Sequence, residues 1–231
     1  IEEQINPSMQ VTLSDKDFDY LDSNKKEFVK TVLPIIINEN QNILMIRSFV
    51  SELKGKLETF RTLNNKEIRK LNEIAKKYNI KHHNKHKLDL VDEILSNVDI
   101  IPNSIALAQA AIESGWGKSR FAKEYNALFG EYTYDNSKGV IPLERENGDT
   151  HLIKAFSSYS NSVESYFNNI NSHYAYEDFR DIRNIMRERN NFSNVNLLVN
   201  KLSTYAEDEN YIKTIRQVIK TNNFSIFDQK I

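Results

Sequence analysis

The sequence predicts an α+β protein in which helices predominate and one small β-containing lobe interrupts them. Three observations indicate this class. The 231 residues include only six Gly and four Pro, so long helices fit better than many short strands. Apolar residues recur at helical spacing through most of the chain. Residues 129–158 differ, because they combine aromatic residues with turn-forming stretches, and we expect two or three short strands there.

The N-terminal part is predicted to be an arm followed by helices. Residues 1–15 lack periodicity and are expected to form a flexible arm. Residues 16–95 are expected to form an N-terminal helical region. It opens with a helical run from Ser23, which Pro34 is expected to kink or divide. Two further helices are predicted within residues 64–80 and 88–102.

The remaining residues, 96–231, are expected to form a second domain that contains the β lobe. After the lobe the chain returns to helical periodicity. Helices are predicted within residues 160–173, 176–190, 194–206 and 209–222.

A short apolar helix is predicted over residues 104–113, with Asn103 or Ser104 as its cap. Gln109 and Glu113 then share one face with two alanines. The small alanine side chains would let a ligand approach the helix backbone closely on that face, with Gln109 and Glu113 as polar contacts.

Glu113 is the candidate general acid. It lies in the last helical turn, which carries partial negative charge, and its neighbours are apolar. Both effects raise the pKa of a carboxyl group. Cleavage of a glycosidic bond needs an acid that stays protonated near neutral pH. From spacing alone, the alternative is a solvated surface acid. Trp116, between two glycines, offers an aromatic platform for a sugar, although such a Trp is also a common packing device.

Composition excludes several classes of function. Basic and acidic residues nearly cancel, with a net charge of -1, so no global positive field indicates nucleic-acid binding. The absence of Cys excludes disulfides and thiolate metal sites. His82 and His86 have helical i, i+4 spacing but no nearby carboxylate ligand, so we expect no metal and no cofactor. No stretch is long and apolar enough to span a bilayer. No charged-then-apolar signal peptide opens this sequence, and a removed export signal or anchor is compatible with it.

One long stretch resembles a known family. Its sequence, from Val98 to Tyr134, is VDIIPNSIALAQAAIESGWGKSRFAKEYNALFGEYTY. It closely resembles the glucosaminidase branch of peptidoglycan hydrolases, in particular the Bax-type members, which are related to autolysins and flagellar-type N-acetylglucosaminidases. The similarity continues in SVESYFNNINSHYAYEDFR and YAEDENYIKTI and covers about residues 15–225. It implies a lysozyme-like fold, in which a helical lobe and a small β lobe flank a glycan groove, with the N-terminal helices as an extension.

The resemblance also implies an activity, namely cleavage of the β-1,4 bond after N-acetylglucosamine in peptidoglycan, with residues 96–231 as the catalytic domain. Glu113 matches the general acid of the family, and Tyr211 matches a tyrosine that lines the cleft beside it. The second acid is open. Glu131 matches the Bax-type F-G-E-W stretch, and we prefer it as a cleft residue. Glu144 resembles a glutamate of flagellar-type relatives and is a candidate distal carboxylate.

Several aromatic side chains and one amide are candidate substrate contacts, because aromatic faces stack on sugars. They are Gln109, Trp116, Phe129, Tyr132, Tyr134, Tyr159 and Tyr205. From spacing alone, packing is the alternative for each aromatic residue, and a core position is the alternative for Tyr211. Tyr132 stands where the family usually has Trp, which keeps an aromatic platform with a smaller face.

Two mechanisms and three functions stay open at this point. The base could be a second carboxylate, with inversion, or the N-acetyl oxygen of the substrate. Besides the hydrolase, a lytic transglycosylase or a weakly active wall-binding scaffold fits the sequence. We expect peptidoglycan strands as the partner and a place in the bacterial cell envelope, whether periplasmic, anchored or secreted. The N-terminal helices could dock to a membrane-protein partner or serve as an anchor.

Overall fold

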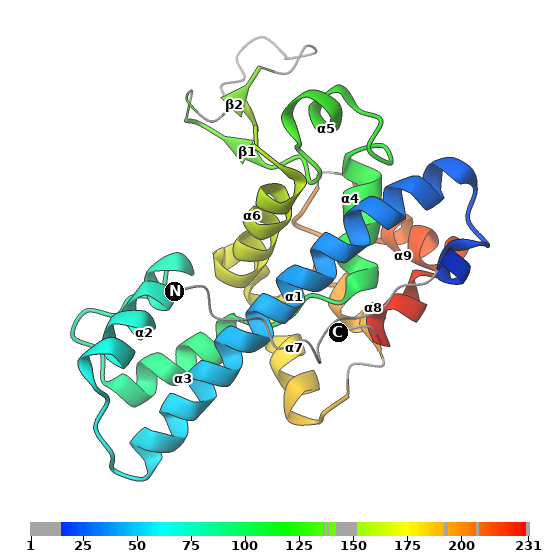
Figure 1. The fold of residues 1–231 in the computed structure, drawn as a ribbon. Coiled ribbons are helices and arrows are strands. Elements are labelled where there is room, and N and C mark those ends of the chain that lie inside the picture. The colour runs from blue at the N-terminus through cyan, green and yellow to red at the C-terminus, as the bar shows by residue number, and fades with distance from the viewer. Residues whose placement is uncertain are drawn as a thin grey trace.

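The structure is a computed structural model of the chain. It describes residues 15–135, 137, 139–141, 152–191, 194–206 and 208–229. Within these residues the protein is mostly helical and has one small antiparallel sheet, as Figure 1 shows. The predicted α+β class is therefore confirmed.

The α-helices in chain order are α1 (Ser23–Glu58), α2 (Asn65–Lys77), α3 (Lys87–Asn97), α4 (Asn103–Glu113), α5 (Arg120–Tyr125), α6 (Tyr159–Ser172), α7 (Glu177–Glu188), α8 (Val195–Val199) and α9 (Tyr211–Thr221). Three short 3-10 helices accompany them, namely η2 (Asp15–Phe18), η3 (Tyr174–Tyr176) and η4 (Phe224–Gln229). The strands are β1 (Tyr132–Thr133), β2 (Gly139–Val140) and β3 (Leu152–Lys154).

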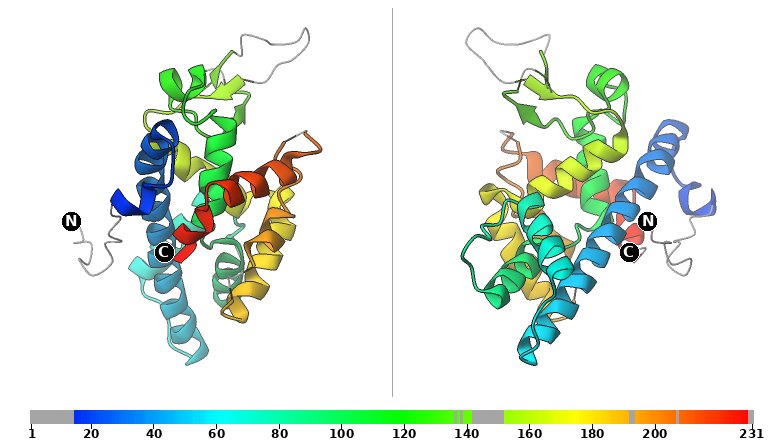
Figure 2. Two further views of the ribbon diagram at one scale, coloured as in Figure 1. Left: turned by 90° about the vertical axis from the view of Figure 1, so that its right-hand side faces the viewer. Right: turned by 60° about the vertical axis from the view of Figure 1, so that its left-hand side comes forward.

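Helix α4 lies at the centre of the fold. Every residue from Asn103 to Ala111 is buried. Helices α1 and α9 and the 3-10 helix η4 all pack on it (Figure 2). The two alanines expected to face a ligand, Ala106 and Ala110, are instead in the core with no exposed surface. That expectation was wrong, because neighbouring helices cover every side of α4 and only its last turn reaches the surface.

Both ends of α4 are capped. At the C-terminal end Gly115 adopts a left-handed conformation with φ 56°. The Gly115 and Trp116 N–H groups donate to Ile112 and Ala111, which is a Schellman motif. At the other end neither Asn103 nor Ser104 acts as the N-cap. The carboxylate of Asp228 instead accepts hydrogen bonds from the Ser104 N–H and hydroxyl, at 2.8 and 2.7 Å.

Helix α1 is one uninterrupted helix of 36 residues, about 54 Å long at 1.5 Å per residue. Its start is capped by the side chain of Asp22, which accepts from the Lys25 N–H. The expectation that Pro34 divides it was wrong. Pro34 lies on the exposed side, while Leu33 and Ile36 beside it are fully buried. Packing of both halves therefore offsets the one helical hydrogen bond that proline removes.

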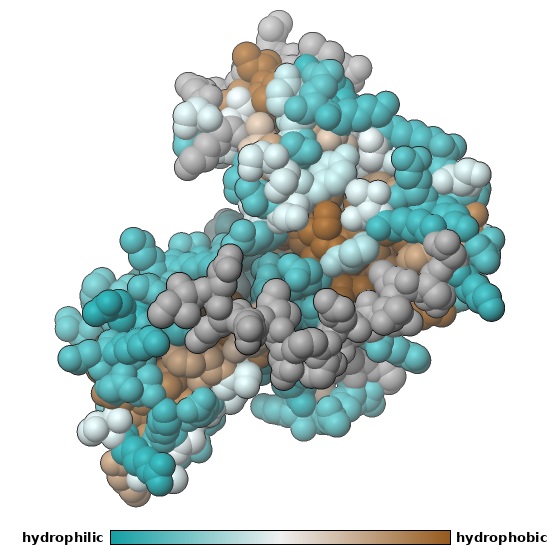
Figure 3. All heavy atoms as spheres, in the orientation of Figure 1, coloured by the Kyte–Doolittle hydropathy of each residue, from teal (hydrophilic) through white to brown (hydrophobic). Residues whose placement is uncertain are grey.

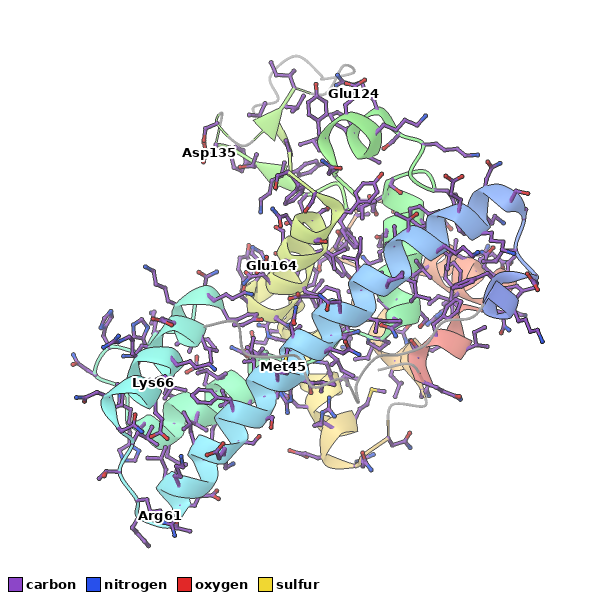
Figure 4. The ribbon with its side chains drawn as sticks, in the orientation of Figure 1. Met45, Arg61, Lys66, Glu124, Asp135 and Glu164 are labelled. Atoms are coloured by element: carbon purple, nitrogen blue, oxygen red, sulfur yellow. The ribbon has the colours of Figure 1, made fainter. Side chains whose placement is uncertain are left out.

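Helices α2, α3 and the second half of α1 form an arm that extends away from the sheet (Figure 1). Figure 4 places Arg61 at the tip of this arm and Asp135 at the opposite side of the molecule, beside β1. Because α1 contacts α3 as well as α4 and α6, it joins the arm to the rest of the chain. The domain boundary between residues 95 and 96 stays a prediction.

The three strands form one sheet in the order β1-β3-β2, with both outer strands antiparallel to β3. Ile153 pairs with Tyr132 on one side and with Val140 on the other. All three strands fall within the lobe expected at residues 129–158, of which residues 142–151 lie outside the described part.

Two helical elements differ from the sequence-based expectation. The short helix α5, directly after the Trp116 loop, was not predicted. In the segment 194–206 the α-helix ends at Val199, and hydrogen-bonded turns continue to Tyr205. Among the described residues, no helix combines the length and apolar character needed to cross a membrane.

The surface seen in Figure 3 is mainly hydrophilic, with apolar residues showing at the centre and along the arm. Beneath it, Asn40 of α1 is fully buried and ties this helix to the segment before α4. Its amide donates to the carbonyl oxygen of Ile101 and to Asn103 Oδ1, and its Oδ1 accepts from the Ile101 N–H. Three buried polar groups therefore depend on one side chain.

We predict that Asn40→Leu lowers the free energy of unfolding by about 2–4 kcal/mol, because it leaves both backbone groups of Ile101 without a partner in the core. Urea denaturation measures this change. The control is Asn38→Leu, at an exposed position two residues earlier in α1, which should change stability by no more than about 0.5 kcal/mol. Equal effects of the two substitutions would contradict the prediction.

Candidate active site

Glu113, the last residue of α4, is half-buried at the surface end of this helix. Its Oε1 accepts a hydrogen bond of 2.7 Å from the hydroxyl of Tyr211, at the start of α9. Its Oε2 lies beside Gly130, where an added Cβ would come within 3.2 Å. Gly130 has φ 62°, a conformation that favours glycine. The absence of a side chain there leaves room for the carboxyl group.

A chain of hydrogen bonds leads from the core to Glu113. The hydroxyl of Tyr166, in α6, donates to Gln109 Oε1 at 2.6 Å. Gln109 Nε2 donates to the Tyr211 oxygen at 3.0 Å, and Tyr211 donates to Glu113. Gln109 is fully buried, so the expectation that it contacts a ligand directly was wrong. Its amide is used to hold Tyr211.

Burial raises the pKa of Glu113, and the hydrogen bond from Tyr211 partly opposes this by stabilising the carboxylate. The pKa of Tyr211 is also raised, first by burial and then by the charge of Glu113. Tyr211 therefore remains a hydrogen-bond donor at neutral pH. The result is a carboxyl group that holds a proton more tightly than usual and has a fixed donor on one oxygen.

Glu131 lies next to Gly130, at the foot of the sheet. Its Oε2 accepts a hydrogen bond of 2.9 Å from Ser165, and Lys154 Nζ lies 3.8 Å from the same oxygen. Lys154 also donates to Ser165 at 2.6 Å. Burial raises the pKa of Glu131, against the effects of Lys154 and Ser165. Its Oε1 is buried without a hydrogen-bond partner among the described residues. Glu144 lies outside the described residues.

Two of the aromatic residues predicted to contact substrate pack behind Glu113. Phe129 is 1% exposed and stacks on Tyr166, with ring centroids 4.0 Å apart. Phe129 has no free face for a sugar, so this expectation differs from the structure. Tyr205 donates to the Phe129 carbonyl oxygen at 2.8 Å and lies parallel to Tyr211 at 5.8 Å. The stack holds Tyr211 in place.

The other predicted aromatic contacts fall in two places. Tyr132 and Tyr134 are 64% and 77% exposed on the β lobe. Trp116 and Tyr159 line a pocket of about 250 Å³ together with Phe28 of α1. Trp116 is partly covered, because Phe28 meets it edge-on and Lys25 Nζ lies 5.1 Å above its ring. The structure thus does not gather all seven predicted contacts around Glu113.

Sequence reasoning missed Tyr166, Ser165, Lys154 and Gly130, which the fold brings close to the two glutamates. No local sequence pattern identifies them. Tyr166, for example, has the spacing of a residue on the apolar face of its own helix. Among the described residues, no cluster of three His, Asp or Glu side chains could hold a metal ion.

A mostly helical fold that presents a half-buried carboxyl with a raised pKa near a small antiparallel sheet defines a candidate general-acid enzyme. A family model named glucosaminidase, described as mannosyl-glycoprotein endo-beta-N-acetylglucosaminidase, matches residues 88–224. The chain therefore belongs to the glucosaminidase family, and the resemblance described from the sequence is confirmed.

The chain is similar in sequence to two relatives, and one solved structure aligns with it. Protein bax of Escherichia coli K12 is 32% identical over 184 residues, which cover 79% of this chain and 63% of that protein. Peptidoglycan hydrolase FlgJ of Escherichia coli O157:H7 is 36% identical over 93 residues, 35% of this chain and 29% of that protein. The chain thus spans less than two thirds of the length of these relatives. The catalytic domain of the autolysin Auto from Listeria monocytogenes has a TM-score of 0.48, with 16% identity, 92% of this chain covered and 94% of that chain.

The space beside the carboxyl of Glu113 is the basis of one prediction. Gly130→Ala should lower the free energy of unfolding by about 1–2 kcal/mol, because φ 62° disfavours a Cβ and the Glu113 carboxyl must move. The control is Gly55→Ala in α1, where an added Cβ meets open space. This change should instead stabilise by about 0.5–1 kcal/mol. Urea denaturation of both variants would refute the prediction if they shift in the same direction.

The hydrogen bond from Tyr211 to Glu113 is the basis of a second prediction about this site. Tyr211→Phe removes a donor that stabilises the carboxylate, so the pKa of Glu113 should rise further. Carbon-13 NMR titration of the Glu side chains measures this pKa without any substrate. Tyr205→Phe is the matched control, because its hydroxyl donates to a backbone carbonyl and not to the carboxyl. An unchanged or lower pKa in Tyr211→Phe would exclude the assigned role.

Proposed function

We propose that this protein hydrolyses the β-1,4 glycosidic bond after N-acetylglucosamine in peptidoglycan, with Glu113 as proton donor. The observation that carries the proposal is the half-buried carboxyl at the end of α4, whose pKa burial raises. Membership of the glucosaminidase family supports the reaction type. The name of one relative, peptidoglycan hydrolase FlgJ, supports peptidoglycan as the polymer that is cleaved.

In the proposed reaction Glu113 donates its proton to the glycosidic oxygen as the bond to the anomeric carbon breaks. The leaving sugar departs as a neutral alcohol, and Glu113 becomes a carboxylate. Tyr211 already donates to this carboxyl, so it stabilises the charge that forms. Burial favours the protonated form of Glu113 before the step, and the hydrogen bond from Tyr211 stabilises the carboxylate that forms afterwards.

We keep two routes for the second half of the reaction. Glu131 could act as the base for water, with inversion at the anomeric carbon. Its side chain is only 11% exposed and one oxygen is engaged by Ser165, which disfavours this route. The acetamide oxygen of the substrate could instead attack the anomeric carbon, and this route needs no second carboxylate. The configuration of the first product distinguishes them, since only the second route retains it.

Substrate contacts are proposed on the β lobe and around α1. Tyr132 and Tyr134 are exposed enough to stack on sugar rings. Trp116 and Tyr159 would contact the polymer through the pocket they share. We also propose a place in the bacterial cell envelope, because peptidoglycan lies there. The projecting arm is a candidate docking element for a membrane-protein partner, and Phe60 near its tip is 97% exposed.

We predict that Glu113→Gln lowers the rate of glycan cleavage by about 10²–10⁴-fold, the usual contribution of a general acid. Purified protein is incubated with peptidoglycan, and the soluble fragments are separated and weighed by mass spectrometry. Glu164→Gln is the matched control. Glu164 is an exposed residue of α6 paired with Lys77, and its loss should leave the rate unchanged.

The new chain ends decide between the functions. Reducing ends at N-acetylglucosamine support the proposal. Anhydro-sugar ends would show a lytic transglycosylase instead. A wild-type protein as inert as Glu113→Gln would leave only the wall-binding scaffold.

A further inference from the structure

Tyr166 is a buried phenol at the inner end of the hydrogen-bond chain. It has no exposed surface, and its ring is stacked on Phe129. Burial raises the pKa of its hydroxyl, which therefore keeps its proton. The hydroxyl donates to Gln109 Oε1 at 2.6 Å and makes no other hydrogen bond to the residues that the structure describes. Gln109 is thus its one acceptor in this part of the protein.

This contact fixes the orientation of the Gln109 amide. An amide has one accepting oxygen and one donating nitrogen. Because Oε1 is taken by Tyr166, Nε2 must point to Tyr211, and the Tyr211 oxygen must accept. Tyr211 has a single proton, and it can then go only to Glu113 Oε1, 2.7 Å away. Each donor in the chain is determined by the one before it.

The amide of Gln109 could also be placed in the opposite orientation, but this would cost one buried hydrogen bond. If the amide turned over, Gln109 Oε1 would take the proton of Tyr211, and Glu113 would lose its donor. The Tyr166 hydroxyl would then face an NH₂ group and have no acceptor in the core. A buried hydroxyl without a partner is unfavourable. Tyr166 therefore sets the direction of the whole chain.

The direction matters for the proton of Glu113. Oε1 accepts from Tyr211, so whenever Glu113 is protonated the acidic proton belongs on Oε2, which lies beside Gly130. We propose that Tyr166 and Gln109 are positioning residues, which act through Tyr211 to keep the donated proton of Glu113 on Oε2. This inference rests on the proposed role of Glu113 as general acid. Neither residue needs to touch the substrate.

The test uses the single variants Tyr166→Phe and Gln109→Met and the double variant that combines them. Tyr166→Phe frees Gln109 Oε1, so the amide can turn and capture the proton of Tyr211. The pKa of Glu113 should rise, as in Tyr211→Phe, and kcat should fall about tenfold with KM little changed, a fraction of what a general acid contributes. Gln109→Met removes the competing acceptor together with the amide that holds Tyr211. Tyr211 can then still donate to Glu113, and both values should lie between those of the wild type and of Tyr166→Phe.

The double variant is the decisive one. With no amide to capture its proton, Tyr211 should again donate to Glu113, and the pKa and kcat should return toward wild type although Tyr166 is absent. A merely structural role for Tyr166 gives no such rescue. Tyr78→Phe is the control for lost packing, because it removes the hydroxyl of a different buried tyrosine. It should change neither the pKa of Glu113 nor kcat.

The outcomes separate this inference from the proposed function. Carbon-13 titration of Glu113 needs no substrate, so it tests the chain of donors even if the protein proves inactive on peptidoglycan. A wild-type pKa in Tyr166→Phe, or a double variant as impaired as Tyr166→Phe, overturns the inference. If Tyr166→Phe does not fold, Gln109→Met alone still decides. A pKa of Glu113 as high as in Tyr211→Phe would show that Tyr211 does not donate to Glu113 once the competing oxygen is removed, which overturns the inference.

Discussion

The burial of α4 from Asn103 to Ala111 is the constraint on which the site depends. Its small side chains allow α1, α9 and η4 to pack around it, so the helix cannot shift without disturbing the whole core. Only its final turn emerges, and Glu113 is placed there. A carboxyl fixed in this way is partly removed from water, and this is what raises its pKa. The same packing brings Tyr211 from α9 within hydrogen-bond distance.

Much of this could be predicted from the sequence because the signals are local. Helical periodicity identified α1, α2, α3 and α6, and the change in composition at residues 129–158 identified the sheet. The apolar helix ending at Glu113 was also predicted, although its cap was not, and the raised pKa of its carboxyl was expected from two short-range effects. The burial of the face that carries Ala106 and Ala110 was not predicted. A helix with apolar residues on all sides does not reveal which of its faces pack against neighbouring helices.

The unpredicted parts depend on contacts between distant segments. Gln109 meets Tyr166 across 57 positions and Tyr211 across 102, and Ser165 reaches Glu131 across 34. Spacing within one helix cannot show such pairs. Phe129 illustrates the same limit, because an aromatic residue beside a glycine suits a sugar platform equally well as the buried partner of Tyr166. The family resemblance predicted Tyr211 beside Glu113, where spacing alone left a core position as an equal alternative, and the two side chains are hydrogen-bonded.

The contact between Asp228 and Ser104 has a consequence for biosynthesis. These residues are 124 positions apart, so the start of the central helix is held by a residue that the ribosome adds 124 positions later. Until then the N–H and hydroxyl of Ser104 lack the acceptor that they have in the folded protein. The helix that ends at Glu113 is therefore expected to be completed only after Asp228 has left the exit tunnel.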